Sequence, residues 1–255
     1  MTEDQKKFYD ENGYVILEKI FTDNEAETFN SFVRRHANIN FAALINPDRY
    51  ESLLEQDERP KSDITLKEIK ETSNMARSIM TDKRMSDLLS YFHEKNAVGL
   101  SSQFIFKEAY SDYCSQAWKP HQDNFYPKSK NAAYITLNWF LKDADRENGT
   151  IYCYPGSHKL GLLPAENNVS FREKIGDNPG SECKIPEEFL DKKTDIIIPG
   201  NSIVVLNGNC IHGSYPNNSN RSRPWFSSCY ITEGEEFIVG NSSKREVIDL
   251  ATGNS

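Results

Sequence analysis

The sequence has little that would mark a membrane, nucleic-acid-binding or disulfide-stabilised protein. Its five cysteines in 255 residues are scattered, and the absence of a Cys-x-x-Cys pair argues against a zinc ribbon or a redox dithiol. No apolar run approaches the roughly 20 residues of a membrane span. Basic residues number 30 against 38 acidic ones, and the resulting net charge of −8 argues against a nucleic-acid surface.

The chain opens with the polar, acidic stretch Met1-Thr2-Glu3-Asp4. A secretory signal would need a basic start followed by an apolar run, so this opening predicts a soluble, cytoplasmic protein. The length allows one large domain with a core of its own.

The first hundred residues have a helical pattern. A short helix is expected over Gln5–Asn12, ended by Gly13, and a strand follows over Tyr14–Leu17. Thr22 with the acids after it resembles a helix start, and apolar residues recur at helical spacing over Thr65–Lys95.

Beyond residue 98 the pattern changes to short β-branched and aromatic runs separated by Gly, Pro and Asn turns. These predict strands over Ser101–Phe106, Ala133–Leu141, Thr150–Tyr154, Asp195–Ile198, Ser202–Leu206 and Trp225–Ile231. Closely spaced strands without helices between them are typical of an antiparallel sandwich or barrel. The polar region before Asp195 indicates a long insertion between strands.

The most informative residues are His121 and Asp123, which are two positions apart. Because side chains at i and i+2 of a strand leave on the same face, one strand would aim both at one point, with Gln122 facing away. His212, which follows a strand-like run and a Gly-containing turn, would add a second imidazole. Two histidines and one carboxylate suit Fe(II) and leave positions open for dioxygen and a chelating co-substrate.

Arg223 lies at the start of the last expected strand. A dicarboxylate co-substrate needs a fixed cation at its far end, and a guanidinium can bind a carboxylate through two parallel hydrogen bonds. Together with the histidines and the aspartate, Arg223 indicates an iron-dependent oxygenase.

Several motifs give the chain a resemblance to a known family over nearly its whole length. They are the opening Phe8-Tyr9-Asp10-Glu11-Asn12-Gly13-Tyr14-Val15-Ile16, then Trp118-Lys119-Pro120-His121-Gln122-Asp123, Glu147-Asn148-Gly149-Thr150, Pro155-Gly156-Ser157-His158, His212-Gly213-Ser214 and Arg223. In this order they resemble the phytanoyl-CoA dioxygenase family of Fe(II)/2-oxoglutarate-dependent oxygenases.

The resemblance implies a mainly β fold with flanking helices around a double-stranded β-helix, the jelly-roll core of cupin-like proteins. It implies one dioxygenase domain over residues 1–255. Within it, helix-rich residues 1–97 would pack on a barrel formed by residues 98–235, with an insertion at about 159–193.

The resemblance also implies the roles of individual residues. His121, Asp123 and His212 would be the catalytic iron ligands. Arg223 would hold the far carboxylate of 2-oxoglutarate, and its spacing of eleven from His212 favours it over the rival Arg221. Gln103, Trp139 and Ser214 would line the co-substrate pocket.

The implied activity is hydroxylation with release of succinate and CO2, using Fe(II), 2-oxoglutarate and O2, with ascorbate as a reductant in vitro. Related halogenases have a small residue where this chain has Asp123, so the carboxylate argues against halogenation. A small polar metabolite is the favoured substrate, which Asn124, Tyr126 and Lys128 could help to bind. No nucleic-acid or membrane partner is expected, and a monomer and a dimer both stay open.

Alternatives to this activity remain open at this point. The substrate could instead be an acyl thioester or a natural-product intermediate. A catalytically silent barrel would bind ligands only, yet all four key residues are present. A cupin-type isomerase or hydrolase would usually have further His or Glu ligands in the first motif, which offers only one His and one Asp.

Overall fold

The computed structural model describes residues 1–36, 44–45, 66–93, 95–111, 114–129, 131, 133–169, 180–238 and 247–251, to which the statements below are limited. The helices are α1 (Glu3–Asn12), α2 (Asp23–His36), α4 (Leu66–Met80) and α5 (Lys83–Leu89), with short 3-10 helices η1 (Asp123–Phe125), η2 (Ser157–Leu160) and η3 (Glu187–Lys192). The strands are β1 (Tyr14–Glu18), β2 (Leu44–Ile45), β3 (Ala97–Lys107), β4 (Trp118–His121), β5 (Ile135–Phe140), β6 (Ile151–Cys153), β7 (Ala165–Val169), β8 (Gly180–Cys183), β9 (Thr194–Asp195), β10 (Ser202–Asn207), β11 (His212–Ser214) and β12 (Arg223–Thr232).

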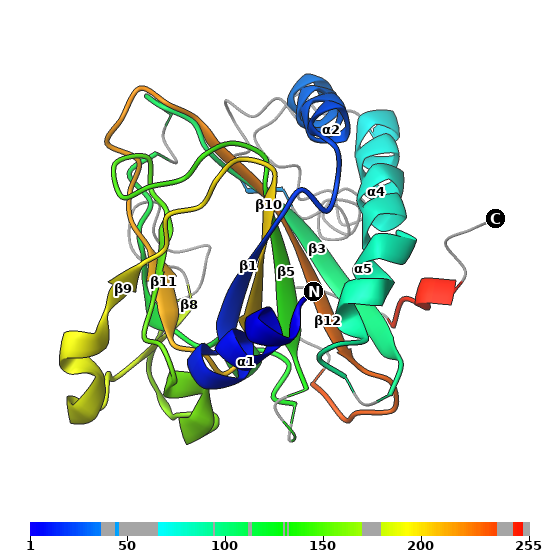
Figure 1. Ribbon diagram of the computed structural model, residues 1–255. Helices are drawn as coiled ribbons and strands as arrows, with labels where there is room; N and C mark the ends of the chain where they lie inside the picture. The colour runs from blue at the N-terminus through cyan, green and yellow to red at the C-terminus, as the bar shows by residue number, and fades with distance from the viewer. Residues whose placement is uncertain are drawn as a thin grey trace.

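Two antiparallel sheets form the core. Figure 1 shows helices α2, α4 and α5 on the side of the larger sheet that faces away from the smaller sheet. The larger sheet has the order β1-β10-β5-β12-β3-β2, and the smaller has the order β4-β11-β6-β9. Neighbouring strands are far apart in sequence, as in β12 between β5 and β3, which is a jelly-roll pattern. The mainly β fold with a jelly-roll core is therefore confirmed.

The two faces of the larger sheet have different partners because side chains alternate along each strand. On β5, Leu137 and Trp139 belong to the large apolar core that includes Phe29 of α2. Phe140 points the other way and packs with Ile151 of the smaller sheet. One face is thus covered by helices, and the other faces the smaller sheet.

The N-terminal helices follow from local signals in the sequence. Thr2 and Gln5 form a capping box at the start of α1, and Gly13, with φ of 82°, ends it in the left-handed conformation that favours glycine. The expected helix over Thr65–Lys95 is instead two helices, because the Asp82 side chain accepts a hydrogen bond from the Arg84 amide and starts α5.

The remaining strands differ from expectation mainly in length. The run Asp195–Ile198 contributes only its first residue to β9, while Ile198 forms an isolated bridge to Ala144. The polar region before it contains β7, β8 and η3, and the two strands pair with each other. Residues 170–179 of this region lie outside the described part of the chain.

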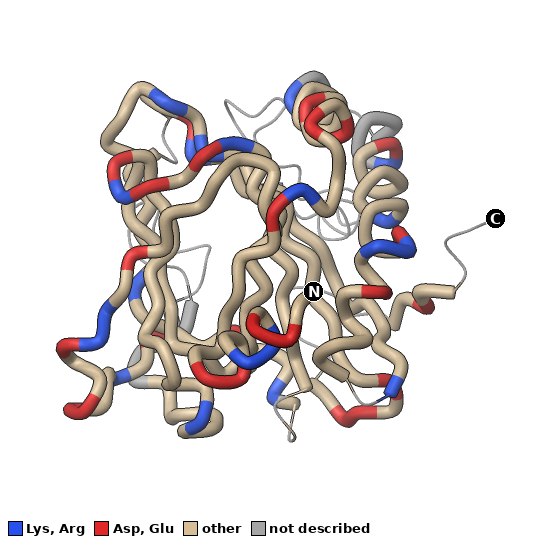
Figure 2. The backbone as a smooth tube through the Cα atoms, in the orientation of Figure 1, with Lys and Arg blue, Asp and Glu red and all other residues tan. Residues whose placement is uncertain are grey.

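Charged residues of both signs lie mostly on helices and connections in the view of Figure 2, whereas the central strands carry few. Within the described residues, no helix is long and apolar enough to cross a membrane.

Candidate active site

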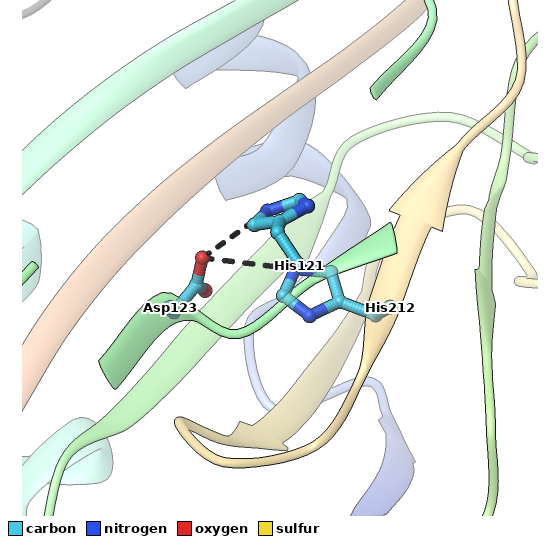
Figure 3. A group of neighbouring side chains, drawn as sticks. All are labelled: His121, Asp123 and His212. Atoms are coloured by element: carbon cyan, nitrogen blue, oxygen red, sulfur yellow. Dashed lines mark ion pairs between the residues drawn. The ribbon is translucent and has the colours of Figure 1, made fainter. Parts of the chain in front are cut away.

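His121, Asp123 and His212 come together between the two sheets, as Figure 3 shows. β4 ends at His121, and Asp123 begins η1, so the two are not on one strand as the sequence predicted. Gln122 between them is still extended, with φ of −119° and ψ of 125°, and this keeps its neighbours on one side.

Gln122 faces the opposite side and holds the segment in place. Its amide donates to the carbonyls of Gly161 and Asn209, at 2.8 and 2.7 Å, and its side-chain oxygen accepts from the Leu163 amide at 2.7 Å. The side chain is buried with its polar atoms bonded, so it fixes the direction of its two neighbours.

His212 reaches the same space from the smaller sheet. It pairs with His121 of β4 on one side and with Cys153 of β6 on the other. Because Cys153 packs inward with Phe140, its paired neighbour His212 also faces the larger sheet.

The three side chains present their ligand atoms to one point. Asp123 Oδ1 lies 3.4 Å from Nε2 of His121 and 3.7 Å from Nε2 of His212. One ligand atom from each residue lies within 4.8 Å of the others. Two imidazole nitrogens and one carboxylate oxygen on one side of a point form the donor set of a facial triad.

Hydrogen bonds on the far side of each ring set the tautomer that a metal requires. Nδ1 of His121 lies 2.7 Å from the Lys119 carbonyl, and Nδ1 of His212 lies 3.0 Å from the Cys210 carbonyl. A carbonyl only accepts, so each Nδ1 carries the hydrogen and each Nε2 offers its lone pair toward Asp123. The residues therefore fit a divalent metal.

The surroundings of His212 and Asp123 keep both side chains in the protonation states that a metal needs. Burial lowers the pKa of His212 to about 4, so the ring is neutral near pH 7. Burial alone would raise the pKa of Asp123, but the neighbouring histidines outweigh this and lower it, so the carboxyl is ionised.

A pair of buried cations lies further along the same space. Arg223 on β12 pairs with Lys107 on β3, and both side chains are fully buried. Lys107 Nζ crosses to the smaller sheet, where it donates to Ser214 Oγ at 2.8 Å and to the Tyr215 carbonyl at 2.5 Å. The Arg223 guanidinium lies over the Trp225 ring, 4.3 Å from its centroid.

Burial, and secondarily Arg223, lower the pKa of Lys107 well below its usual value. Two adjacent buried cations are unfavourable unless an anion joins them. Reasoning from the sequence missed Lys107. Its signal was the alternation Gln103-Ile105-Lys107, which places a lysine on the same face of the strand as Gln103.

A polar cluster fixes the strand ends that carry these cations. Arg34 of α2 donates to Glu108 at 2.7 Å and to Ser222 at 2.6 Å, and Ser222 also bonds with Glu108. Glu108 follows Lys107 in the chain and Ser222 precedes Arg223, so the cluster holds β3 and β12 at the level of the cation pair.

Of the other residues expected in the co-substrate pocket, Ser214 and Gln103 face the space between the sheets. Ser214 contacts Lys107, as described above. Gln103 is half-buried and lies on the same face of β3 as Lys107, four residues before it. Arg221, the rival to Arg223, is on the surface, where it pairs with Asp145 at 2.7 Å.

Trp139 requires a correction, because its side chain does not face the site. It lies on the helix-covered face of β5, stacked between Phe21 and Phe29 at centroid distances of 4.2 and 5.2 Å. Its Nε1 donates to Asn201 Oδ1 at 3.0 Å. The inward residue at this place is its neighbour Asn138, since a shift of one residue along a strand exchanges the faces.

Residues after the metal strand are mainly structural. The Asn124 amide donates to the Ser129 carbonyl at 3.0 Å and to Asn209 Oδ1 at 2.8 Å, which ties η1 to the turn before His212. Lys128 lies over the Phe125 ring, 5.1 Å from its centroid. His158 Nε2 lies 3.2 Å from the Asp10 carbonyl and so connects η2 to α1.

Comparison with known proteins places this geometry in a family. The phytanoyl-CoA dioxygenase (PhyH) family model matches residues 9–225. Phytanoyl-CoA dioxygenase 1 of Oryza sativa subsp. japonica is 25% identical over 278 residues, covering 97% of this chain and 95% of the relative. A probable alpha-ketoglutarate-dependent hypophosphite dioxygenase of Stutzerimonas stutzeri is 27% identical over 229 residues, covering 86% and 74%.

Solved structures share the fold at lower identity. The epimerase SnoN, solved with Fe3+, alpha ketoglutarate and nogalamycin RO, has a TM-score of 0.67 at 17% identity, over 92% of this chain and 85% of that one. EctD from S. alaskensis, solved with 2-oxoglutarate and 5-hydroxyectoine, has a TM-score of 0.61 at 17% identity, over 93% and 78%.

The fold, the triad and the family match together define an Fe/2-oxoglutarate-dependent oxygenase. More narrowly, the chain belongs to the phytanoyl-CoA dioxygenase family.

Proposed function

We propose that this protein hydroxylates a small polar metabolite in a reaction that uses Fe(II), 2-oxoglutarate and O2 and releases succinate and CO2. The observation that carries the proposal is the arrangement, between the two sheets, of a facial triad and of a pair of buried cations beyond it. The first suits a metal and the second suits the far end of a dianionic co-substrate.

His121, Asp123 and His212 would hold the iron through Nε2, a carboxylate oxygen and Nε2. When bound, Fe(II) would supply the activation of dioxygen that is coupled to oxidative decarboxylation of 2-oxoglutarate. The protein's part is to keep both Nε2 lone pairs and the carboxylate aimed at one point. The carbonyls of Lys119 and Cys210 do this by fixing the two rings.

Arg223 and Lys107 would bind the far carboxylate of 2-oxoglutarate, and Ser214 would donate its hydroxyl hydrogen. Ser214 already accepts from Lys107, so its remaining hydrogen is available to an anion. It also lies two residues from His212 on β11, about 7 Å along the strand. A five-carbon diacid has a suitable length to reach from the triad to the cation pair.

The inner face of the larger sheet supports a polar substrate. Gln103, Asn138 and Ser227 all lie on the face directed at the smaller sheet. Their polar groups would lose hydrogen bonds to water against a long apolar chain. An acyl thioester or a natural-product intermediate is the alternative substrate class, and the test below includes one.

Succinate release tests the proposal directly. Anaerobically purified protein would receive Fe(II), ascorbate and 2-oxoglutarate, then air, with and without a panel of small metabolites. We expect slow succinate formation that requires iron and that a panel member accelerates. His212→Ala is the matched control and should give none. Absence of both succinate and 2-oxoglutarate binding in the native protein would instead indicate a silent barrel.

A further inference from the structure

Three polar side chains form a row across the inner face of the larger sheet. Gln103 on β3 pairs with Ser227 on β12, and Ser227 pairs in turn with Asn138 on β5. Paired residues on neighbouring strands share a face, and Asn138 lies on the same face as inward-pointing Phe140. We call Gln103, Ser227 and Asn138 the polar row.

The polar row has hydrogen-bonding atoms that the described protein does not use. Asn138 and Ser227 are 6% and 8% exposed, and Gln103 is half-buried. The side chains of Gln103 and Ser227 bond to no described residue. None of these atoms is among the buried side-chain atoms that lack a partner in the described residues, so they are accessible to solvent. A row of accessible donors and acceptors without protein partners marks a place where water or a ligand binds.

Asn138 shows which kind of group is missing. Its Nδ2 donates to Thr136 Oγ1 at 2.9 Å and to the Val204 carbonyl at 3.3 Å. The carbonyl can only accept, so the orientation of the amide is set and Oδ1 remains for a donor. No described residue donates to Oδ1.

Contacts between the sheets place the row at the level of the triad. At one end, Lys107 contacts Ser214, two residues beyond His212 on β11. At the other end, the backbone N–H of Asn124, next to Asp123, donates to the Gly208 carbonyl. The backbone N–H of Gly208 donates in turn to the Tyr134 carbonyl.

On the larger sheet, the first of these contacts lies at the level of Arg223, which pairs with Lys107, and the second lies at the level of Tyr134. Ser227 lies four residues from Arg223, and Asn138, its partner, lies four residues from Tyr134. The row therefore lies between the two levels and opposite the triad. Gln103 lies four residues before Lys107 on β3, which is about 13 Å along the strand.

From this arrangement we infer that the polar row is the specificity determinant for the oxidised substrate, which carries neutral hydroxyl or amide groups next to the carbon attacked. The inference deepens the proposed function and rests on it. The row offers neutral donors and acceptors and no charge, so an ionic group set against it would lose hydration without gaining a counter-ion. Gln103 then serves the substrate and not the co-substrate carboxylate.

Two adjacent serines on β12 give a matched pair of variants. Ser227 faces inward in the row, whereas Ser228 faces the helix-covered side and donates to the Leu137 carbonyl at 3.2 Å. Ser227→Ala removes a substrate contact and Ser228→Ala does not. Gln103→Leu and Asn138→Leu extend the test across the row, with melting temperature as the check on folding.

The experiment measures 2-oxoglutarate-dependent succinate release with two sets of probes. One set is neutral and polar: glycerol, myo-inositol, nicotinamide and N-acetylglucosamine. The other is hexanoate and hexanoyl-coenzyme A. We expect a polar probe to accelerate succinate release at least threefold. Ser227→Ala should then raise the KM for that probe about three- to tenfold, the effect of one lost hydrogen bond, while Ser228→Ala stays within twofold.

Three results would overturn the inference. One is acceleration by the acyl probes alone, and another is acceleration by no probe in protein that forms succinate slowly. The third is a row variant that raises the KM for 2-oxoglutarate and leaves the KM for the probe unchanged. Failure of the proposed function has a separate signature, since native protein would then form no succinate even without a probe.

Discussion

Replacing Lys107 with methionine should weaken 2-oxoglutarate binding strongly while leaving the unliganded fold intact. The Lys107 amino group is buried beside Arg223, and both side chains face the place proposed for the far carboxylate. A hydrogen bond to a charged group contributes about 1.5–3 kcal/mol, which corresponds to about a ten- to hundredfold rise in the KM for 2-oxoglutarate. Lys142→Met, on the exposed surface where Lys142 pairs with Glu27, is the matched control and should leave this KM unchanged.

The stability of the same variant separates a binding role from a structural one. The substitution removes a buried polar group whose charged form is unfavourable beside Arg223, although the Tyr215 carbonyl loses a donor. The unliganded free energy of unfolding should therefore stay within about 1 kcal/mol of the native value. The rise in melting temperature caused by 2-oxoglutarate should shrink, because weaker binding stabilises less.

The pH dependence of 2-oxoglutarate binding gives an independent test of the role of Lys107. Burial and Arg223 lower the pKa of Lys107 in the unliganded protein, and a bound dianion would raise it again. Above the lowered pKa, binding must take up a proton, so the Kd for 2-oxoglutarate should increase with pH, by at most about tenfold per unit.

This titration belongs above pH 6, where His212, with a pKa of about 4, stays neutral. Anaerobic calorimetry in buffers of different ionisation enthalpy would detect the proton uptake. Native-like affinity in Lys107→Met, or a native Kd that does not vary with pH, would refute the assignment of Lys107.

The remaining predictions concern the other site residues. His121→Ala and His212→Ala should each abolish iron binding, measured as metal content after anaerobic loading, and normal turnover by either would disprove the triad. Arg223→Ala should raise the KM for 2-oxoglutarate about tenfold or more, whereas Arg221→Ala, which breaks only surface pairs, should leave it unchanged. Trp139→Phe should lower the free energy of unfolding by about 1–2 kcal/mol through the lost bond to Asn201, with no change in that KM; a raised KM would contradict its outward placement.

The sequence allowed the overall architecture and the triad to be predicted because both depend on local patterns. Short strands with turn residues between them indicate an antiparallel fold. His121 and Asp123 remain on one side because Gln122 is extended, even though β4 ends before Asp123. The choice of Arg223 over Arg221 agrees with their burial, since Arg223 is inside and Arg221 is on the surface.

The details that could not be predicted depend on strand register and on contacts between distant strands. Trp139 and Asn138 are neighbours, and only the pairing of β5 decides which of them faces the iron site. In the sequence, Lys107 resembles an ordinary polar residue at the end of a strand. Its role becomes visible only when β3 pairs with β12 and the smaller sheet brings Ser214 within 2.8 Å.

The charges of the site are opposite in sign to those of the chain. The protein carries a net charge of −8, yet the described inner faces contribute the cations Lys107 and Arg223 against the single carboxylate Asp123. A buried charge acts over a few ångströms with little screening, whereas surface charges are screened within about 8 Å at physiological ionic strength. The inner pair can therefore attract a dianion that the average surface charge would repel. Lys107 and Arg223 lie on β3 and β12, whereas Asp123 follows β4 of the smaller sheet. The fold therefore separates the anion site from the metal site, and the polar row lies opposite the metal site.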